Sequence, residues 1–286
     1  MTFKNLKNNF IKTLKHLYAE HECESIFYIL AEHVFKSTKS EIHLNFNNNI
    51  PIEKLLDFNN CLSELKQSKP IQYVIGESSF FDLNFIVNEN VLIPRQETEE
   101  LVNLIINDKL NSKSRLKILD IGTGSGCIAI SLSTNISKAE VFACDISEKA
   151  LEVAKNNAVR NNCNVSFFKL DIANCENYKV NEKFDIIVSN PPYVIKYQTS
   201  AMQKNVLDYE PHIALFAPDD SPLFFYDKIL QFAEKYLVSG GWIYFEINEI
   251  YHSQIEELIS KFNYKNIEIV KDINDKFRMA KAQKNG

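Results

Sequence analysis

Glycine is scarce in this sequence, which has only 7 glycines among its 286 residues. The 6 cysteines and 6 histidines are dispersed, and they form neither a Cys-x-x-Cys pair nor a His-x3-His spacing. Without such spacings, a zinc site and a disulfide framework are both disfavoured. We therefore expect no metal, and we expect the cysteines to be reduced thiols with mostly structural roles.

Long hydrophobic runs and a strong charge of one sign are also missing. No stretch approaches the length of about 20 apolar residues that a membrane-spanning helix needs, and the first residues lack a signal-peptide core. The 37 acidic and 32 basic residues give a net charge of −5, so bulk electrostatics provides no attraction to a polyanion. These features predict a soluble, cytoplasmic protein with no direct nucleic-acid or membrane partner.

Three of the seven glycines fall within five residues, in the run Gly122-Thr123-Gly124-Ser125-Gly126. This run follows the apolar segment Lys117–Ile121, which reads as a buried strand, and precedes the apolar start of a helix at Cys127. Such clustering in a glycine-poor chain indicates a loop whose backbone approaches a ligand closely. An ordinary tight strand-to-helix turn is the less favoured alternative. The spacing G-x-G-x-G, rather than G-x-G-x-x-G, argues against a dinucleotide.

Two acidic residues follow the next apolar segments. Asp145 comes after Val141–Cys144, 19 residues beyond Gly126, where a strand-end acid can accept both hydroxyls of a ribose. Its alternative role is to cap the following helix, but Ser147 can serve as that cap and leave Asp145 free. Asp171 ends the segment Val165–Leu170, where its carboxylate could reach an adenine amino group. Strand-end aspartates are also common in plain loops.

The run Asn190-Pro191-Pro192-Tyr193 directly follows the apolar segment Phe184–Val188 and Ser189. The two prolines stiffen the turn, so the Asn190 side-chain carbonyl and a neighbouring backbone carbonyl can hold both hydrogens of a planar NH2 group. Tyr193 offers a flat face against which such a group can pack. A Pro-Pro turn that simply ends a strand is the alternative.

Hydrophobic periodicity divides the chain into three parts. Residues 1–69 show helical periodicity, which predicts a small bundle that either docks a protein partner or only covers the catalytic domain. A β-hairpin linker is expected within 70–94, over residues 71–92, and 95–286 alternate helices and strands. This last part predicts a seven-stranded α/β sheet with a final antiparallel pair, helices over 97–107, 222–237 and 249–262, and a substrate-covering loop over 195–206.

Taken together, these motifs resemble class I S-adenosylmethionine-dependent methyltransferases. The run Asn190 to Tyr193 is similar to the signature shared by glutamine-amide and adenine-N6 methyltransferases. From about residue 70 to 278, further segments are similar to release factor glutamine methyltransferases of the HemK type: Ile93-Pro94-Arg95-Gln96-Glu97-Thr98-Glu99, Tyr209-Glu210-Pro211, Ala214-Leu215-Phe216, Gly240-Gly241-Trp242 and Phe245-Glu246-Ile247. Two positions depart from that pattern: Gln96-Glu97 replace the usual Pro-Asp, and Ile172 replaces an aromatic found in some members.

The resemblance implies a class I methyltransferase (Rossmann-like) fold with S-adenosyl-L-methionine as the cofactor. It implies catalytic roles for Asn190, Pro191, Pro192 and Tyr193. The cofactor-binding residues it implies are Gly122, Thr123, Gly124, Ser125, Gly126, Asp145, Asp171, Ile172 and Asn190.

The implied reaction is methyl transfer to the side-chain nitrogen of a glutamine, in the Gly-Gly-Gln motif of class 1 peptide chain release factors. A glutamine of a ribosomal protein is a closely related alternative. Adenine-N6 methylation of nucleic acid is a further one, but it predicts a basic groove or a target-recognition domain, and neither is evident. A cofactor-binding scaffold without activity is the non-enzymatic alternative, which the intact Asn190 to Tyr193 run disfavours.

Overall fold

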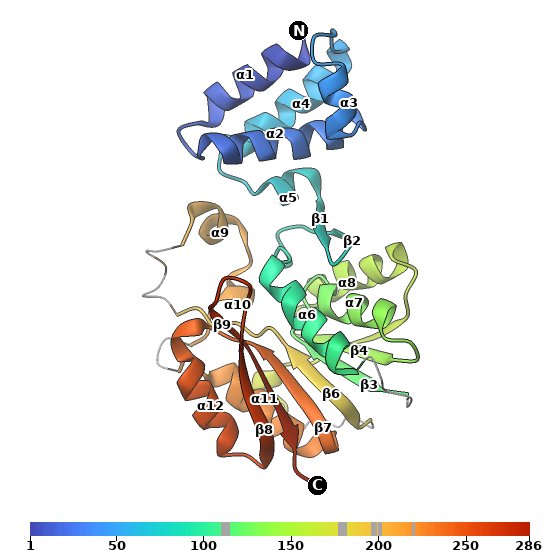
Figure 1. The fold of residues 1–286 in the computed structure, drawn as a ribbon, viewed down its shortest axis with the longest axis vertical. Coiled ribbons are helices and arrows are strands. Elements are labelled where there is room, and N and C mark those ends of the chain that lie inside the picture. Colours follow the sequence, from blue (N-terminus) through green and yellow to red (C-terminus); the bar gives the residue numbers. More distant parts are fainter. Residues whose placement is uncertain (110–114, 177–181, 196–198, 200–201, 219–220) are drawn as a thin grey trace. The chain divides into compact units, whose positions relative to one another are not determined.

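The computed structural model describes residues 1–109, 115–176, 182–195, 199, 202–218 and 221–286 (Figure 1). The chain divides into two compact units. The first comprises Met1–Glu77 with Gln203–Tyr209, and the second comprises Ser78–Met202 with Glu210–Gly286. Part of the expected loop over 195–206, namely 196–198 and 200–201, lies outside the described residues. From Lys204 to Tyr209 the chain forms helix α9 instead of loop.

The first unit confirms the predicted helical bundle. Its core contains the rings of Phe10, Phe27 and Phe58, which are fully buried and meet one another with centroids 5.6–5.8 Å apart. Short polar turns separate the helices, and Thr2 and Thr38 cap two of them with their hydroxyl oxygens. The main helices are α1 (Phe3–Leu14), α2 (Glu20–Phe35), α3 (Lys39–Leu44) and α4 (Ile52–Leu65).

The predicted hairpin over 71–92 is shorter than expected. Ile71–Ile75 form the short helix α5, and only β1 (Glu77–Phe80) and β2 (Leu83–Ile86) pair as a hairpin. Pro70 precedes the helix and Gly76 ends it in the left-handed conformation. A five-residue helix is too short to show a 3.6-residue period in the sequence. The strand pattern of Phe80–Val87 therefore led to a predicted hairpin that begins too close to Pro70.

The second unit contains a seven-stranded sheet in the order β5-β4-β3-β6-β7-β9-β8 (Figure 1). All neighbouring strands are parallel except β9, which is antiparallel to both β7 and β8, as the predicted final pair requires. The strands are β3 (Lys117–Ile121), β4 (Glu140–Asp145), β5 (Val165–Lys169), β6 (Phe184–Ser189), β7 (Leu237–Glu246), β8 (Tyr264–Lys271) and β9 (Phe277–Lys284).

Helices cover both faces of this sheet. Helix α6 contacts α7, which contacts α8, on one face, whereas α11 and α12 contact each other on the opposite face (Figure 1). The helices predicted over 97–107, 222–237 and 249–262 correspond to α6, α11, and η3 with α12, with ends displaced by a few residues. The helices are α6 (Gln96–Lys109), α7 (Cys127–Asn135), α8 (Glu148–Arg160), α10 (His212–Leu215), α11 (Phe224–Tyr236) and α12 (His252–Ser260), with 3-10 turns η1 (Ile172–Asn174) and η3 (Glu249–Tyr251).

The order of the strands changes direction between β3 and β6, which are neighbours in the sheet. From β3 the strands proceed to β4 and β5 on one side, and β6, β7 and the final pair lie on the other. In doubly wound sheets a crevice opens at the carboxyl ends of the strands at such a point, because the connecting helices leave toward opposite faces. Ile121 at the end of β3 is paired with Ser189 at the end of β6, so both predicted motifs begin at this crevice.

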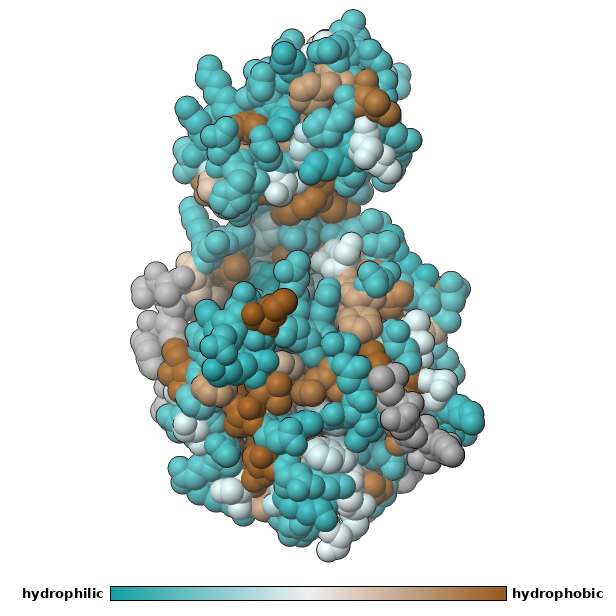
Figure 2. All heavy atoms as spheres, viewed as in Figure 1, coloured by the Kyte–Doolittle hydropathy of each residue, from teal (hydrophilic) through white to brown (hydrophobic). Residues whose placement is uncertain are grey.

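Hydrophilic side chains cover most of the face that Figure 2 shows, with hydrophobic residues between them. The larger exposed hydrophobic residues include Leu44, Ile52 and Leu56 of the first unit and Ile213 of the second. Among the described residues, no helix is both long enough and apolar enough to cross a membrane. Those residues also contain no group of three or more His, Cys, Asp or Glu side chains placed to hold a metal ion.

Candidate active site

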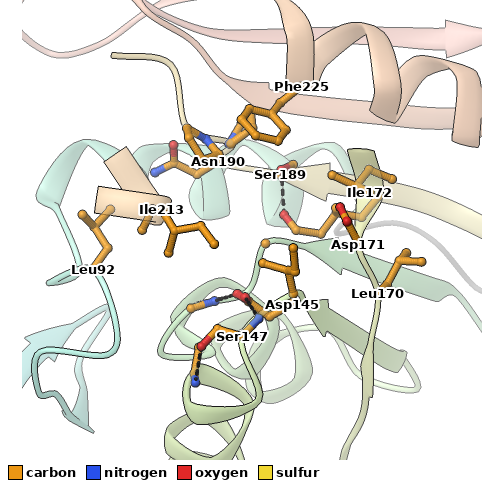
Figure 3. A pocket seen from close by; sticks show the side chains of 18 of the residues that line it. Leu92, Asp145, Ser147, Leu170, Asp171, Ile172, Ser189, Asn190, Ile213 and Phe225 are labelled. Atoms are coloured by element: carbon orange, nitrogen blue, oxygen red, sulfur yellow. Dashed lines mark hydrogen bonds between the residues drawn. The ribbon is translucent and has the colours of Figure 1, made fainter. Parts of the chain in front are cut away.

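A cavity of about 290 Å³ lies at the carboxyl ends of the central strands of the second unit. It is lined by the residues that follow β3, β4, β5 and β6, which are the four places where the sequence predicted functional residues. Figure 3 shows Asn190 and Phe225 above Asp145, with Leu170 and Ile172 on one side and Leu92 and Ile213 on the other. The fold therefore brings the separate motifs to one concave site.

The glycine-rich loop forms the floor of this site through Gly122 and Gly124. The backbone N–H of Gly124 donates to Oδ2 of Asp145 over 2.9 Å, and the N–H of Gly122 donates to the Cys144 carbonyl. A Cβ added at either glycine would meet no atom within 4 Å, so the loop is open where it lines the cavity. Thr123 points away, and its hydroxyl donates to Asp120 over 2.6 Å.

Gly126, at the far end of the loop, packs against helices α7 and α8. An added Cβ there would lie 3.0 Å from Ile130 and 3.2 Å from the Ala154 Cβ, and the φ angle of +84° already disfavours a side chain. Buried Asn157 of α8 fixes the same region, because its Nδ2 donates to the Ser125 carbonyl over 2.9 Å. Ser125 and Gly126 thus support the loop from behind, and neither lines the cavity.

Asp145 lines the cavity at the end of β4. Its Oδ1 accepts from the N–H of Ser147 and its Oδ2 accepts from Gly124, both at 2.9 Å. Ser147 is the N-cap of α8, as predicted, with its hydroxyl oxygen accepting from the N–H of Ala150. The expectation that Asp145 is free of protein partners was therefore wrong, but each carboxylate oxygen keeps a lone pair for a ligand hydroxyl. Burial raises the pKa of Asp145, and these N–H donors oppose that shift.

Asp171 and Ile172 line the cavity after β5. The carboxylate of Asp171 caps η1 by accepting from the N–H of Ala173 over 2.9 Å, and its other oxygen accepts from the Asn174 side chain. Both residues are half-buried, and Ile172 packs on the hydrophobic core. The aliphatic Ile172 can still supply an apolar wall where some family members place an aromatic ring.

Asn190, Pro191 and Pro192 line the cavity after β6. The Asn190 side chain donates from Nδ2 to the hydroxyl oxygen of Thr98 over 3.3 Å. Ser189 anchors the start of the turn, because its hydroxyl donates to the Ile121 carbonyl of β3 over 2.6 Å. The turn is therefore tied to the strand that carries the glycine-rich loop.

Tyr193 is half-buried and packs on the core, and it does not line the cavity. Its hydroxyl donates to Oε1 of Glu246 over 3.1 Å, while Oε2 of the same carboxylate accepts from Thr98 over 2.6 Å. Glu246 ends β7 and is buried. Burial raises its pKa, and the Thr98 and Tyr193 hydroxyls and the charge of Arg278 oppose that shift.

An ion pair lies close to the site in the sequence segments that flank it. Arg95 donates to Oε1 of buried Glu210 over 2.5 Å, and Oε2 of Glu210 accepts from the backbone N–H of Ile93 over 3.2 Å. These contacts join Ile93 and Arg95 to Glu210. Glu210 leads directly into α10, whose Ile213 lines the cavity.

Several residues of the site were not predicted from the sequence as site residues. Leu92, Ile213 and Phe225 line the cavity from segments that have no motif of their own, and apolar residues there resemble any core residue. Thr98 and Glu246 lie within the segments Ile93–Glu99 and Phe245–Ile247 that carry the family resemblance, but no role was predicted for either residue. Glu246 could have been noticed from the sequence, because it is an acidic residue at the end of an otherwise apolar strand.

The strand order, the antiparallel β9 and the site at the carboxyl ends of the strands define a class I methyltransferase fold. A solved methyltransferase from Pyrococcus furiosus has the same fold, with a TM-score of 0.52 and 22% identity over 80% of this chain and 100% of that one. Residues 99–208 also match a family described as "Methyltransferase small domain".

The sequence relatives identify the family more closely. Residues 6–76 match the "PrmC N-terminal domain". A release factor glutamine methyltransferase from Flavobacterium psychrophilum is 47% identical over 284 residues, 99% of each chain, and one from Bacteroides thetaiotaomicron is 37% identical over 273 residues, 96% of this chain and 97% of the relative. The chain belongs to the release factor glutamine methyltransferase family. It is an S-adenosylmethionine-dependent methyltransferase.

Proposed function

We propose that this protein transfers a methyl group from S-adenosylmethionine to the side-chain amide nitrogen of the glutamine in the Gly-Gly-Gln motif of class 1 release factors. The observation that carries the proposal is the placement of Asn190 across one cavity from Asp145 (Figure 3). An amide-gripping group and a ribose-binding acid thereby share one site. Relatives named release factor glutamine methyltransferases, 47% and 37% identical over nearly the whole chain, support the choice of acceptor.

The residues on the lower side of the cavity fit the cofactor. We assign the ribose hydroxyls to Asp145, whose oxygens retain acceptor capacity, and the adenine to the apolar wall of Leu170 and Ile172 beside Asp171. Gly122 and Gly124 leave the floor open, so that a ligand can approach the backbone. Thr123, Ser125 and Gly126 shape the loop from behind. Bound S-adenosylmethionine supplies an electrophilic methyl group on a positively charged sulfonium.

The acceptor amide is assigned to the Asn190 turn. An amide nitrogen is a poor nucleophile because its lone pair is delocalised, and holding both of its hydrogens with acceptors aims that nitrogen at the methyl group. Oδ1 of Asn190 and the backbone carbonyl of Pro191 are the two acceptors we assign, and Pro192 stiffens the turn. Packing of the Tyr193 ring on the amide stays a prediction.

Orientation accounts for most of the catalysis in this scheme. Transfer would form the bond between nitrogen and the methyl carbon as the bond between sulfur and that carbon breaks, and it would release a neutral thioether and one amide proton to water. Because the sulfonium is already activated, a positioned acceptor in an apolar cavity matters more than a strong base. Leu92, Ile213 and Phe225 supply apolar walls near Asn190 (Figure 3). No histidine or lysine lines this cavity among the described residues.

The domain roles are part of the same proposal. Residues 1–69 are assigned to docking of the release factor, 70–94, which contain helix α5 and the short β1–β2 hairpin, to a linker, and 95–286 to catalysis. Matching of residues 6–76 to the N-terminal domain of this family supports a family-specific role for the first part. A cytoplasmic location, without a membrane or nucleic-acid partner, stays a prediction.

The test is transfer of an isotopically labelled methyl group to an unmodified class 1 release factor. Its loop Gln→Ala variant, ribosomal proteins and DNA are assayed in parallel as acceptors. Labelling of the release factor that disappears in the Gln→Ala variant is the expected result. Labelling of a ribosomal protein or of DNA instead would overturn the release factor as the acceptor. No labelling of any acceptor would favour a cofactor-binding scaffold without activity.

A further inference from the structure

We propose that Thr98, held by Glu246, is a positioning residue that fixes the rotation of the Asn190 side-chain amide and keeps its oxygen available to the methyl acceptor. The inference rests on the proposed function, because that function gives Asn190 its role. The residues come from three elements, since Thr98 lies on α6, Glu246 ends β7 and Asn190 follows β6. They belong to three sequence segments that the family resemblance noted separately.

Hydrogen bonds connect these residues in series. Nδ2 of Asn190 lies 3.3 Å from Oγ1 of Thr98, which lies 2.6 Å from Oε2 of Glu246. The second oxygen of Glu246 accepts from the Tyr193 hydroxyl at 3.1 Å. Thr98 and Glu246 are only 3% and 2% exposed, so water does not compete for these bonds.

The single hydroxyl hydrogen of Thr98 determines which group donates in its hydrogen bonds to Glu246 and Asn190. The hydroxyls of Thr98 and Tyr193 both donate to Glu246, which is the arrangement that an acceptor-only carboxylate requires. Thr98 has a single hydroxyl hydrogen, and Glu246 uses it. Toward Asn190 the Thr98 oxygen can therefore only accept, which requires the NH2 end of the amide to face Thr98. The carbonyl oxygen of Asn190 is then directed away from Thr98.

The opposite rotation of the amide is disfavoured. It would place the Asn190 oxygen against the Thr98 oxygen with no hydrogen between them, which loses one hydrogen bond and brings two acceptors together. An asparagine side chain has no intrinsic preference between these rotations, because its oxygen and nitrogen are nearly the same size. Thr98 and Glu246 therefore supply a preference that the Asn190 turn by itself lacks.

Both oxygens of Glu246 are placed as acceptors, Oε2 toward the Thr98 hydroxyl and Oε1 toward the Tyr193 hydroxyl. Burial and the nearby charge of Glu97 raise the pKa of this carboxyl, whereas the Thr98 and Tyr193 hydroxyls and Arg278 lower it. Arg278 is itself tied to Asp272 by an ion pair of 3.3 Å. The pKa of Glu246 is raised on balance, because burial is the largest of these effects, and the two donated hydroxyls and the positive charge of Arg278 partly offset it.

Kinetics of two Thr98 variants test the proposal. Thr98→Val keeps the shape and removes the hydroxyl, and we expect kcat for release factor methylation to fall about tenfold or more, as expected for loss of an oriented hydrogen bond. Affinity for S-adenosylmethionine should change less than about twofold, because Thr98 does not line the cofactor side. Thr98→Ser restores the hydroxyl and should recover most of the lost kcat. An unchanged kcat in Thr98→Val would overturn the proposal.

A spectroscopic measurement keeps the test independent of the acceptor. The side-chain amide signals of Asn190 are assigned in the ¹⁵N-labelled protein by their loss in Asn190→Ala. In the wild type, one Nδ2 hydrogen should exchange more slowly than the other, since it donates to Thr98; Thr98→Ser should keep this protection and Thr98→Val should lose it. Two equally unprotected hydrogens in the wild type would refute the positioning role. If no release factor is methylated, the proposed function fails, while this measurement still decides the amide rotation.

Discussion

Oδ2 of Asp145 accepts a hydrogen bond from the backbone N–H of Gly124 over 2.9 Å, so the acid at the end of β4 also holds the loop that follows β3. These two strands are neighbours in the sheet. One carboxylate therefore shapes the floor of the cavity and lines it at the same time. Loss of that carboxylate should affect binding of the cofactor more than the chemistry that follows.

Replacement of Asp145 tests whether this carboxylate acts mainly in cofactor binding. Asp145→Ala removes both the proposed ribose acceptor and the support of Gly124, and we expect the Kd for S-adenosylmethionine to rise about tenfold or more. Asp145→Asn is the matched control, since it keeps one acceptor oxygen and should bind with intermediate affinity. Titration calorimetry measures both. Wild-type affinity in Asp145→Ala would contradict the assignment.

Replacement of Asn190 should have the opposite effect. Asn190→Ala removes the amide that we assign to grip the acceptor, so kcat should fall by about a hundredfold or more. Affinity for S-adenosylmethionine should stay nearly unchanged, because the cofactor is assigned chiefly to other residues. Comparable loss of kcat and of cofactor affinity would instead show a general disruption of the site.

Gly126 is predicted to be the least replaceable glycine of its loop. Gly126→Ala adds a Cβ at 3.0 Å from Ile130 and 3.2 Å from Ala154, so overpacking of about 1–3 kcal/mol adds to the strain of its positive φ. Gly124→Ala is the matched control, because its φ of +55° is also positive but its added Cβ meets no atom within 4 Å. The free energies of unfolding of the two variants are compared by denaturant unfolding without cofactor. Equal losses of stability would contradict the packing argument.

The buried carboxyl of Asp120 predicts a pH dependence of stability. Burial raises the pKa of Asp120 to about 7 from 3.8, with the Thr123 hydroxyl opposing the shift. Because the folded state then binds this proton more tightly than the unfolded state, the free energy of unfolding should fall as the pH rises from about 4 to about 7, by at most about 1.4 kcal/mol per pH unit. It should level off above that range.

Asp120→Asn provides the comparison for this prediction. The variant cannot ionise at this position, so the difference in unfolding free energy between it and the wild type should change between pH 4 and pH 7 and stay constant above. Other titrating groups contribute equally to both proteins and cancel. A difference that does not change with pH would show that Asp120 keeps an ordinary pKa in the folded protein.

Much of the fold was predictable because its signals are local. The apolar segment Lys117–Ile121 and the clustered glycines after it specify a strand and a loop by themselves. Asp145 ends a second largely apolar strand, and Asn190 follows a third. Parallel strands with right-handed connections then bring their carboxyl ends to one edge. The helix α5 was missed, because five residues between Pro70 and Gly76 carry no period.

The supporting residues of the site were not predictable in the same way. Thr98 and Asn190 are 92 residues apart, and Thr98 and Glu246 are 148 apart, so only the folded sheet brings them together. Nothing in the local sequence of α6 distinguishes Thr98 from other helix positions that face a core. Likewise, the apolar residues Leu92, Ile213 and Phe225 become walls of a cavity only through their placement.

The most direct measurement is the position of the transferred methyl group on the acceptor. After reaction with an unmodified class 1 release factor, fragment mass spectrometry locates the added methyl group, with Asn190→Ala as the control enzyme. We expect a single methyl group on the side-chain nitrogen of the Gly-Gly-Gln glutamine, and almost none with the Asn190→Ala variant. Methylation at any other residue, or equal methylation by Asn190→Ala, would contradict it.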